Sequence, residues 1–172
     1  MTSTYLDPES LQQLLRLLMP ANNLVCRLSL VTGLRIGDVL QLKTSQIQKQ
    51  RFTIHEEKTG KSRRIYIPKK LWVILKKNAG SYWVFPGRDP KKHRTRQAVW
   101  ADVKRARRAL RLHAVVTPHS MRKIAAVEKF KKTGDLQKVQ EYLNHDNSAV
   151  TMIYAMADIL AMQKKKKKKK PP

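Results

Sequence analysis

The feature that most constrains the fold is a change in hydrophobic spacing along the chain. Before residue 45 and after residue 68, apolar side chains recur every three or four positions, as on one face of a helix. Between them, the segments 51–55 and 64–67 alternate apolar with polar residues and are rich in β-branched and aromatic types. This pattern predicts an α+β fold: a mostly helical domain with a small antiparallel hairpin-based sheet.

Start and stop signals delimit the expected elements. Asp7 and Pro8 suit a helix start, whereas Gly33 suits a helix end. Gly60 suits the turn of the hairpin because it tolerates positive φ. We expect helices from Pro8 to before Pro20, Ala21–Thr32, Ile36–Leu42, Lys69–Asn78, Thr95 to about Leu110, Pro118 to Gly134, Asp135 to about Leu143, and Ser148 to about Met162. We expect the sheet to combine Arg51–His55 and Arg64–Ile67 with an extended stretch at Ser45–Ile47.

The charge balance points to a polyanionic partner. The chain has 37 Lys and Arg against 12 Asp and Glu, a net charge of +25, and the run Lys164–Lys170 accounts for only part of the excess. Nucleic acid is the expected partner. An acidic membrane surface is the second choice, but no apolar run approaches the length of about 18 residues that a spanning helix needs. We therefore expect no membrane association.

The cysteine content and the N-terminus point to the cytoplasm. A single cysteine, Cys26, excludes an internal disulfide, and its apolar neighbours predict a buried thiol. Residues Met1–Asp7 lack the positive and apolar regions of a secretion signal.

Two common routes to phosphodiester chemistry are missing from the sequence. The five histidines lack metal-ligand spacing such as His-Glu-x-x-His, and no Gly-x-x-x-x-Gly-Lys-Ser/Thr phosphate loop occurs. We therefore expect no cofactor and no metal. Cleavage of a phosphodiester would then require a nucleophile, guanidinium groups and a proton donor from side chains alone.

Five sequence elements, in order, resemble the tyrosine recombinase (phage integrase) family over residues 6–162. The segment 32–38 resembles the family's first arginine motif, with an acidic residue three positions after the arginine. The other elements are a hairpin lysine, a His-x-x-Arg box, a Leu-Gly-His element in which Asn144 replaces glycine, and a tyrosine nine residues later. The corresponding residues are Arg35, Lys58, His119, Arg122, His145 and Tyr154.

The resemblance implies a catalytic role for each of these six residues. Tyr154 would attack the phosphodiester and form a 3′-phosphotyrosine, with Arg35 and Arg122 clamping the nonbridging oxygens. His119 would accept the phenol proton or bind the phosphate, and His145 would support the same oxygens. Lys58 would protonate the departing 5′ oxygen. The implied partners are double-stranded DNA and further recombinase subunits, as a tetramer on paired sites.

Each residue also has an ordinary structural interpretation. Arg35 could be a surface or salt-bridge arginine paired with Asp38, Lys58 a solvated turn residue, and Tyr154 a core aromatic with its hydroxyl satisfied. The competing functions are a type IB topoisomerase-like activity, a non-catalytic DNA-binding module of the same fold, and RNA binding.

The expected domain organisation has two parts. Residues 1–163 would form the catalytic domain, followed by a disordered polybasic tail at 164–172. The N-terminal core-binding domain that family members generally carry is expected to be absent.

Overall fold

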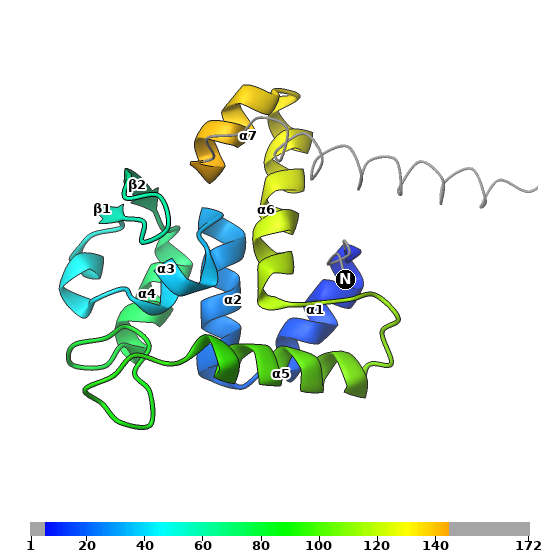
Figure 1. Ribbon diagram of the computed structural model, residues 1–172, viewed down its shortest axis with the longest axis horizontal. Helices are drawn as coiled ribbons and strands as arrows, with labels where there is room; N and C mark the ends of the chain where they lie inside the picture. Colours follow the sequence, from blue (N-terminus) through cyan, green and yellow to red (C-terminus); the bar gives the residue numbers. More distant parts are fainter. Residues whose placement is uncertain (1–5, 145–172) are drawn as a thin grey trace, which may run out of the picture.

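The computed structural model describes residues 6–144, and its order of elements follows the predicted pattern (Figure 1). The elements are α1 (Pro8–Leu17), α2 (Pro20–Thr32), α3 (Ile36–Leu40), the 3₁₀ helix η1 (Thr44–Gln48), β1 (Arg51–His55), β2 (Ser62–Tyr66), α4 (Lys69–Asn78), α5 (Arg96–Ala109), α6 (Pro118–Thr133) and α7 (Leu136–Leu143). The predicted helix from Ser148 to Met162, together with His145, Tyr154 and the lysine run, lies outside the described residues.

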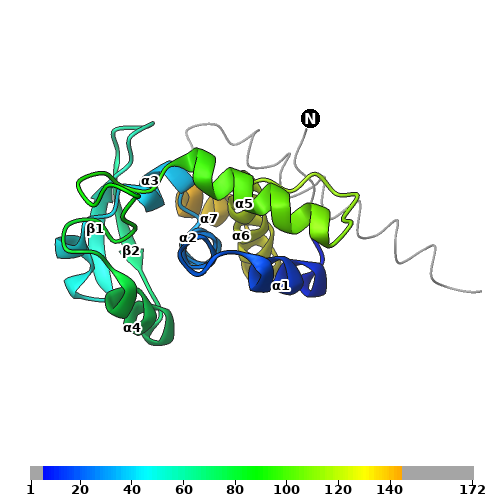
Figure 2. The same ribbon diagram turned by 90° about the horizontal axis from the view of Figure 1, so that it is seen from below.

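Helix α2 is the centre of the fold. It packs against α6, which runs beside it, and α7 packs on α6 (Figure 1). The hairpin and α4 lie on one side of α2, and α1 and α6 lie on the other, as the view from below also shows (Figure 2). The α2 residues Val25, Cys26 and Leu28 have no exposed surface. The prediction of a buried thiol is thus confirmed, and burial raises the pKa of Cys26 to about 12.

Local capping explains why the helix boundaries were predictable. The Asp7 carboxylate accepts a hydrogen bond from the Ser10 backbone N–H at 2.9 Å, at the start of α1. The Thr95 hydroxyl accepts one from Ala98 N–H at 3.1 Å, at the start of α5. Gly33 and Gly134 end α2 and α6 with φ of 66° and 64°. These contacts involve residues three or four positions apart, so they can be predicted from the local sequence.

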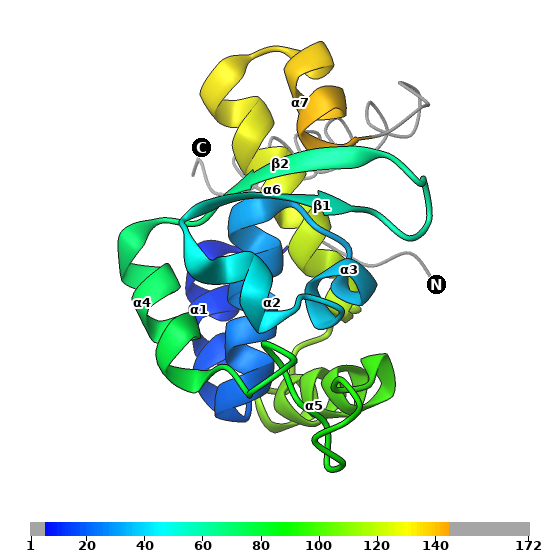
Figure 3. The same ribbon diagram turned by 90° about the vertical axis from the view of Figure 1, so that its left-hand side faces the viewer.

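The sheet contains only the two strands of the hairpin among the described residues. Strands β1 and β2 pair antiparallel, with Arg51 opposite Tyr66 and His55 opposite Ser62, and the loop between them extends past α3 (Figure 3). Gly60 in this loop has the predicted positive φ, 64°.

The expected extended stretch at Ser45–Ile47 is wrong, because this segment forms η1. The Gln46 side chain accepts a hydrogen bond from Lys43 N–H at 2.8 Å, and the Gln48 side chain donates to Thr44 O at 2.9 Å. These local bonds close a helical turn that also buries Ile47 completely.

Within residues 6–144, no helix combines the length and apolar character needed to cross a bilayer.

Candidate active site

Three of the predicted residues line one cavity of about 510 Å³. Arg35 lies at the N-cap of α3, directly after the turn that ends α2. Lys58 comes from the loop between β1 and β2, and His119 from the first turn of α6. Segments far apart in the sequence therefore bring these three side chains to one pocket.

The same cavity contains two side chains of α5 that were not predicted as site residues. Arg96 and Trp100 line it, four positions apart and therefore on one face of the helix. Trp100 is 47% exposed, and the Lys104 ammonium lies 4.7 Å from the centre of its ring. The four-residue spacing of Arg96 and Trp100 could have indicated that both face the site. It did not stand out in the sequence because basic residues occur along the whole helix.

Arg35 pairs with a residue of the hairpin and not with its sequence neighbour. Its Nη1 donates to Glu56 Oε2 at 2.6 Å, whereas Asp38 Oδ1 accepts from the Glu57 backbone N–H at 3.2 Å. The alternative interpretation, in which Arg35 pairs with Asp38, is therefore wrong. Within residues 6–144, Nε and Nη2 of Arg35 make no hydrogen bond, and the side chain keeps 22% of its surface exposed.

Arg122 is buried, with 2% of its surface exposed, and holds three elements together. Its Nη1 donates to Gly33 O at 2.6 Å, after α2, and its Nη2 donates to Leu143 O at 2.5 Å, at the end of α7. Burial lowers the pKa of Arg122 to about 10, the positive charges of Arg35 and Arg63 act in the same direction, and Glu56 opposes them. Arg122 remains protonated at neutral pH.

His119 has an environment that favours the neutral imidazole. Desolvation lowers the pKa of His119 below its ordinary value of 6.5, and the charges of Arg122, Lys123, Arg35 and Lys58 lower it further. A neutral imidazole can accept a proton at physiological pH.

Tyr142, two residues before the Asn144 position, is not a suitable nucleophile. Its hydroxyl donates to Val31 O at 2.9 Å. Burial raises the pKa of Tyr142 to about 12, although the cations Arg63 and Arg122 oppose this shift. The ring instead packs over the end of α2, where an added Cβ on Gly33 would lie 2.7 Å from its Cε1.

Asp38 is the acidic residue of the first arginine motif, and it is nearly buried. Its Oδ2 has no hydrogen-bond partner within the described part of the chain. Desolvation raises the pKa of Asp38, and the nearby Glu56 carboxylate adds to this shift. Residues 6–144 contain no group of three or more His, Cys, Asp and Glu side chains that could hold a metal ion.

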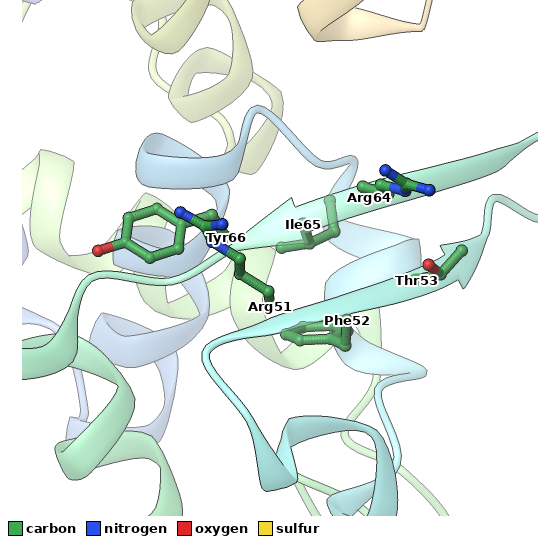
Figure 4. Close-up of a pocket in the computed structure, with 6 residues that line it drawn as sticks. All are labelled: Arg51, Phe52, Thr53, Arg64, Ile65 and Tyr66. Carbon is green, nitrogen blue, oxygen red and sulfur yellow. The ribbon is translucent and has the colours of Figure 1, made fainter.

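A second groove, of about 610 Å³, lies on the hairpin and not at this site (Figure 4). It is lined by Arg51, Phe52, Thr53, Arg64, Ile65 and Tyr66. The Arg51 guanidinium lies 5.5 Å from the centre of the Tyr66 ring. None of the predicted site residues lines this groove.

Known proteins with similar sequences are recombinases and integrases. Tyrosine recombinase XerD of Rhizobium meliloti is 30% identical over 134 residues, which cover 72% of this chain and 43% of that protein. The integrase of Escherichia phage P2 is 28% identical over 152 residues, covering 88% of this chain and 42% of the integrase. The chain spans about half the length, or less, of most of the curated relatives it matches.

Solved structures agree on the fold. The crystal structure of a lambda integrase dimer bound to a COC′ core site superposes with a TM-score of 0.76 at 20% identity, covering 88% of this chain and 59% of that one. The crystal structure of XerA recombinase gives a TM-score of 0.72 at 18% identity, covering 100% of this chain and 67% of that one.

The family model described as the phage integrase family matches residues 4–159, which include all six predicted site residues. The chain therefore belongs to the phage integrase family, that of the tyrosine recombinases.

Proposed function

We propose that this chain is the catalytic domain of a site-specific DNA recombinase, which cuts and rejoins double-stranded DNA in the cytoplasm through a 3′-phosphotyrosine. The observation that carries the proposal is the convergence of Arg35, Lys58 and His119 on one cavity. The buried Arg122 is close enough to His119 for its positive charge to lower the pKa of that imidazole. Family membership supports the same chemistry.

In the proposed reaction, the Tyr154 hydroxyl attacks the scissile phosphorus. The new bond joins phosphorus to the phenolic oxygen, and the bond to the 5′ oxygen breaks. His119 receives the phenol proton, which its lowered pKa permits at neutral pH, and Lys58 supplies a proton to the 5′ oxygen. Because the phosphotyrosine conserves the energy of the broken bond, the reverse attack by a 5′ hydroxyl reseals DNA without ATP or metal.

The two arginines supply the electrostatic part of the proposal. A phenol has an ordinary pKa of about 10, so it is a weak nucleophile at neutral pH. The planar guanidinium of Arg35 would bind the nonbridging oxygens, and Arg122, whose Nη1 and Nη2 each donate to a backbone carbonyl, would bind them through its remaining N–H groups. Both positive charges would stabilise the charge that develops there. His145 would donate to the same oxygens.

We also propose that the chain acts within a tetramer on paired DNA sites. This extends to the present chain what is known of a structural neighbour, a lambda integrase tetramer bound to a Holliday junction. The high positive charge supports DNA as the shared partner.

The test is covalent trapping on DNA. A duplex that binds the protein is selected from a random library, nicked beside the candidate cleavage position, and incubated with the protein. Wild type should form an adduct that survives denaturant, and Tyr154→Phe should form none while still binding DNA. Tyr82→Phe is the matched control, because Tyr82 is exposed on the loop before α5.

Two outcomes would contradict the proposal. An adduct formed by Tyr154→Phe would refute the assignment of Tyr154 as the nucleophile. Relaxation of supercoiled plasmid by the wild type, without joining of paired sites, would support the topoisomerase-like alternative.

A further inference from the structure

Glu56 is a fully buried carboxylate that lies between two arginines. Its Oε2 accepts from Arg35 Nη1 at 2.6 Å, and its Oε1 accepts from Arg63 Nη1 at 3.2 Å. The side chain has no exposed surface. Since a buried carboxylate is costly unless it is paired, the contacts with Arg35 and Arg63 offset the cost of burying Glu56.

Arg63 anchors the carboxylate to the main body of the fold. Arg63 Nη2 donates to Thr32 O at the end of α2, and its side chain is only 9% exposed. Its guanidinium also lies 5.3 Å from the centre of the Tyr142 ring. Through Arg63, Glu56 is thus linked to α2 and α7, and not only to the hairpin.

The contact with Glu56 occupies one nitrogen of Arg35. Nη1 is bonded to the carboxylate, and within residues 6–144 neither Nε nor Nη2 has a hydrogen-bond partner. An arginine that is anchored by one nitrogen has fewer accessible side-chain conformations. It therefore loses less conformational entropy when it binds a phosphate than a freely rotating arginine does.

Glu56 also begins the loop that carries Lys58. Its N–H donates to Lys61 O at 3.1 Å, and its O accepts from Gly60 N–H at 2.8 Å. The Thr59 hydroxyl lies 3.4 Å from Oε2, the oxygen that Arg35 uses. The shortest side-chain contact of Glu56, however, is the one with Arg35, at 2.6 Å.

We propose that Glu56 is a positioning residue that orients Arg35 toward the scissile phosphate. The inference rests on the proposed function, in which Arg35 binds that phosphate. A misplacement of about 1 Å in such a group can cost about a hundredfold in rate. The loss should therefore appear in the chemical step and should not depend on how readily the leaving oxygen departs.

The experiment measures single-turnover cleavage at saturating DNA by Glu56→Gln, on a normal substrate and on one with a 5′-bridging sulfur. A thiolate leaves without protonation, so the sulfur substrate bypasses any defect in proton donation. Glu57→Gln is the matched control. It makes the same change of charge one residue away, at an exposed side chain that bonds Gln41 at 3.0 Å.

We expect Glu56→Gln to be slower by about a hundredfold on both substrates, and Glu57→Gln to match wild type on both. Three results would overturn the proposal: a Glu56→Gln rate equal to the control, rescue by sulfur, or faster cleavage. Rescue would mean that Glu56 acts through Lys58. Faster cleavage would mean that it competes with phosphate for Arg35.

Two further measurements cover failure to fold and failure of the proposed function. Glu56→Asp keeps the charge but shortens the side chain, so it should fold and still be slow on both substrates; a wild-type rate overturns the proposal. A wild-type protein without any DNA adduct would refute the proposed function instead. In that case, NMR relaxation of the Arg35 Nε–H in DNA-free protein tests the contact between Glu56 and Arg35 independently of catalysis. Greater mobility of this group in Glu56→Gln than in Glu57→Gln supports the proposal, and equal mobility overturns it.

Discussion

Replacing Gly33 with alanine perturbs the junction that leads to Arg35. Gly33 has a φ of 66°, and the ideal position of an added Cβ lies 2.7 Å from Tyr142 Cε1 and 3.0 Å from Cζ. Cβ atoms essentially never approach heavy atoms under 3.0 Å, so the ring or the backbone must move. The substitution therefore has two costs, one from the backbone conformation and one from the clash.

The magnitude follows from these two costs. A left-handed conformation costs a residue with a Cβ about 1–2 kcal/mol. A displaced ring also loses the Tyr142 hydroxyl bond to Val31 O, 2.9 Å long, and such a bond contributes about 0.5–1.5 kcal/mol. We expect Gly33→Ala to lower the free energy of unfolding by about 1.5–3.5 kcal/mol, the sum of the two costs.

Gly134→Ala separates the two costs. Gly134 ends α6 at a φ of 64°, and an added Cβ there would meet nothing within 4 Å. It should cost only the conformational part, about 1–2 kcal/mol. Both variants are compared with wild type by urea unfolding, in which a lower midpoint with an unchanged slope reports stability alone.

The excess cost of Gly33→Ala should disappear in a Tyr142→Ala background, because the clashing atoms are absent. Equal losses for Gly33→Ala and Gly134→Ala in the wild-type background would refute the reasoning. They would mean that the ring yields without cost and that its packing over the end of α2 contributes nothing to stability.

The other predictions concern the proposed chemistry. Arg122→Lys should lose about a hundredfold to a thousandfold in cleavage rate. Its free energy of unfolding, measured in urea, should also fall by about 1.5–3 kcal/mol, because the single nitrogen of lysine does not reproduce the two separate nitrogens that bond Gly33 O and Leu143 O. Full stability would contradict this structural role. Because the pKa of His119 is lowered, kcat/KM should fall only as pH drops below 6.5, and His119→Gln should remove that limb from the pH profile. Lys58→Ala should be slow on a normal substrate and near wild type on a 5′-bridging sulfur substrate, in single-turnover assays; equal impairment on both would assign proton donation elsewhere.

The sequence by itself determined the elements and the residue types of the candidate site. Capping by Asp7 and Thr95, and the left-handed glycines at 33 and 134, act over three or four residues, so local patterns were sufficient. Within residues 6–144, the prediction at 45–47 was wrong because side-chain hydrogen bonds within a turn outweighed a short extended pattern.

The partners of these residues were decided only by the tertiary structure. The sequence offered Asp38, three positions away, as one alternative partner for Arg35, yet the hairpin brings Glu56, 21 residues away, to the guanidinium. Packing likewise buries Arg122 against carbonyls that follow α2 and end α7, and it brings Arg96 of α5 into the cavity. Ion pairing depends on distance and desolvation in the assembled fold, and chain packing sets both over separations that local spacing does not encode.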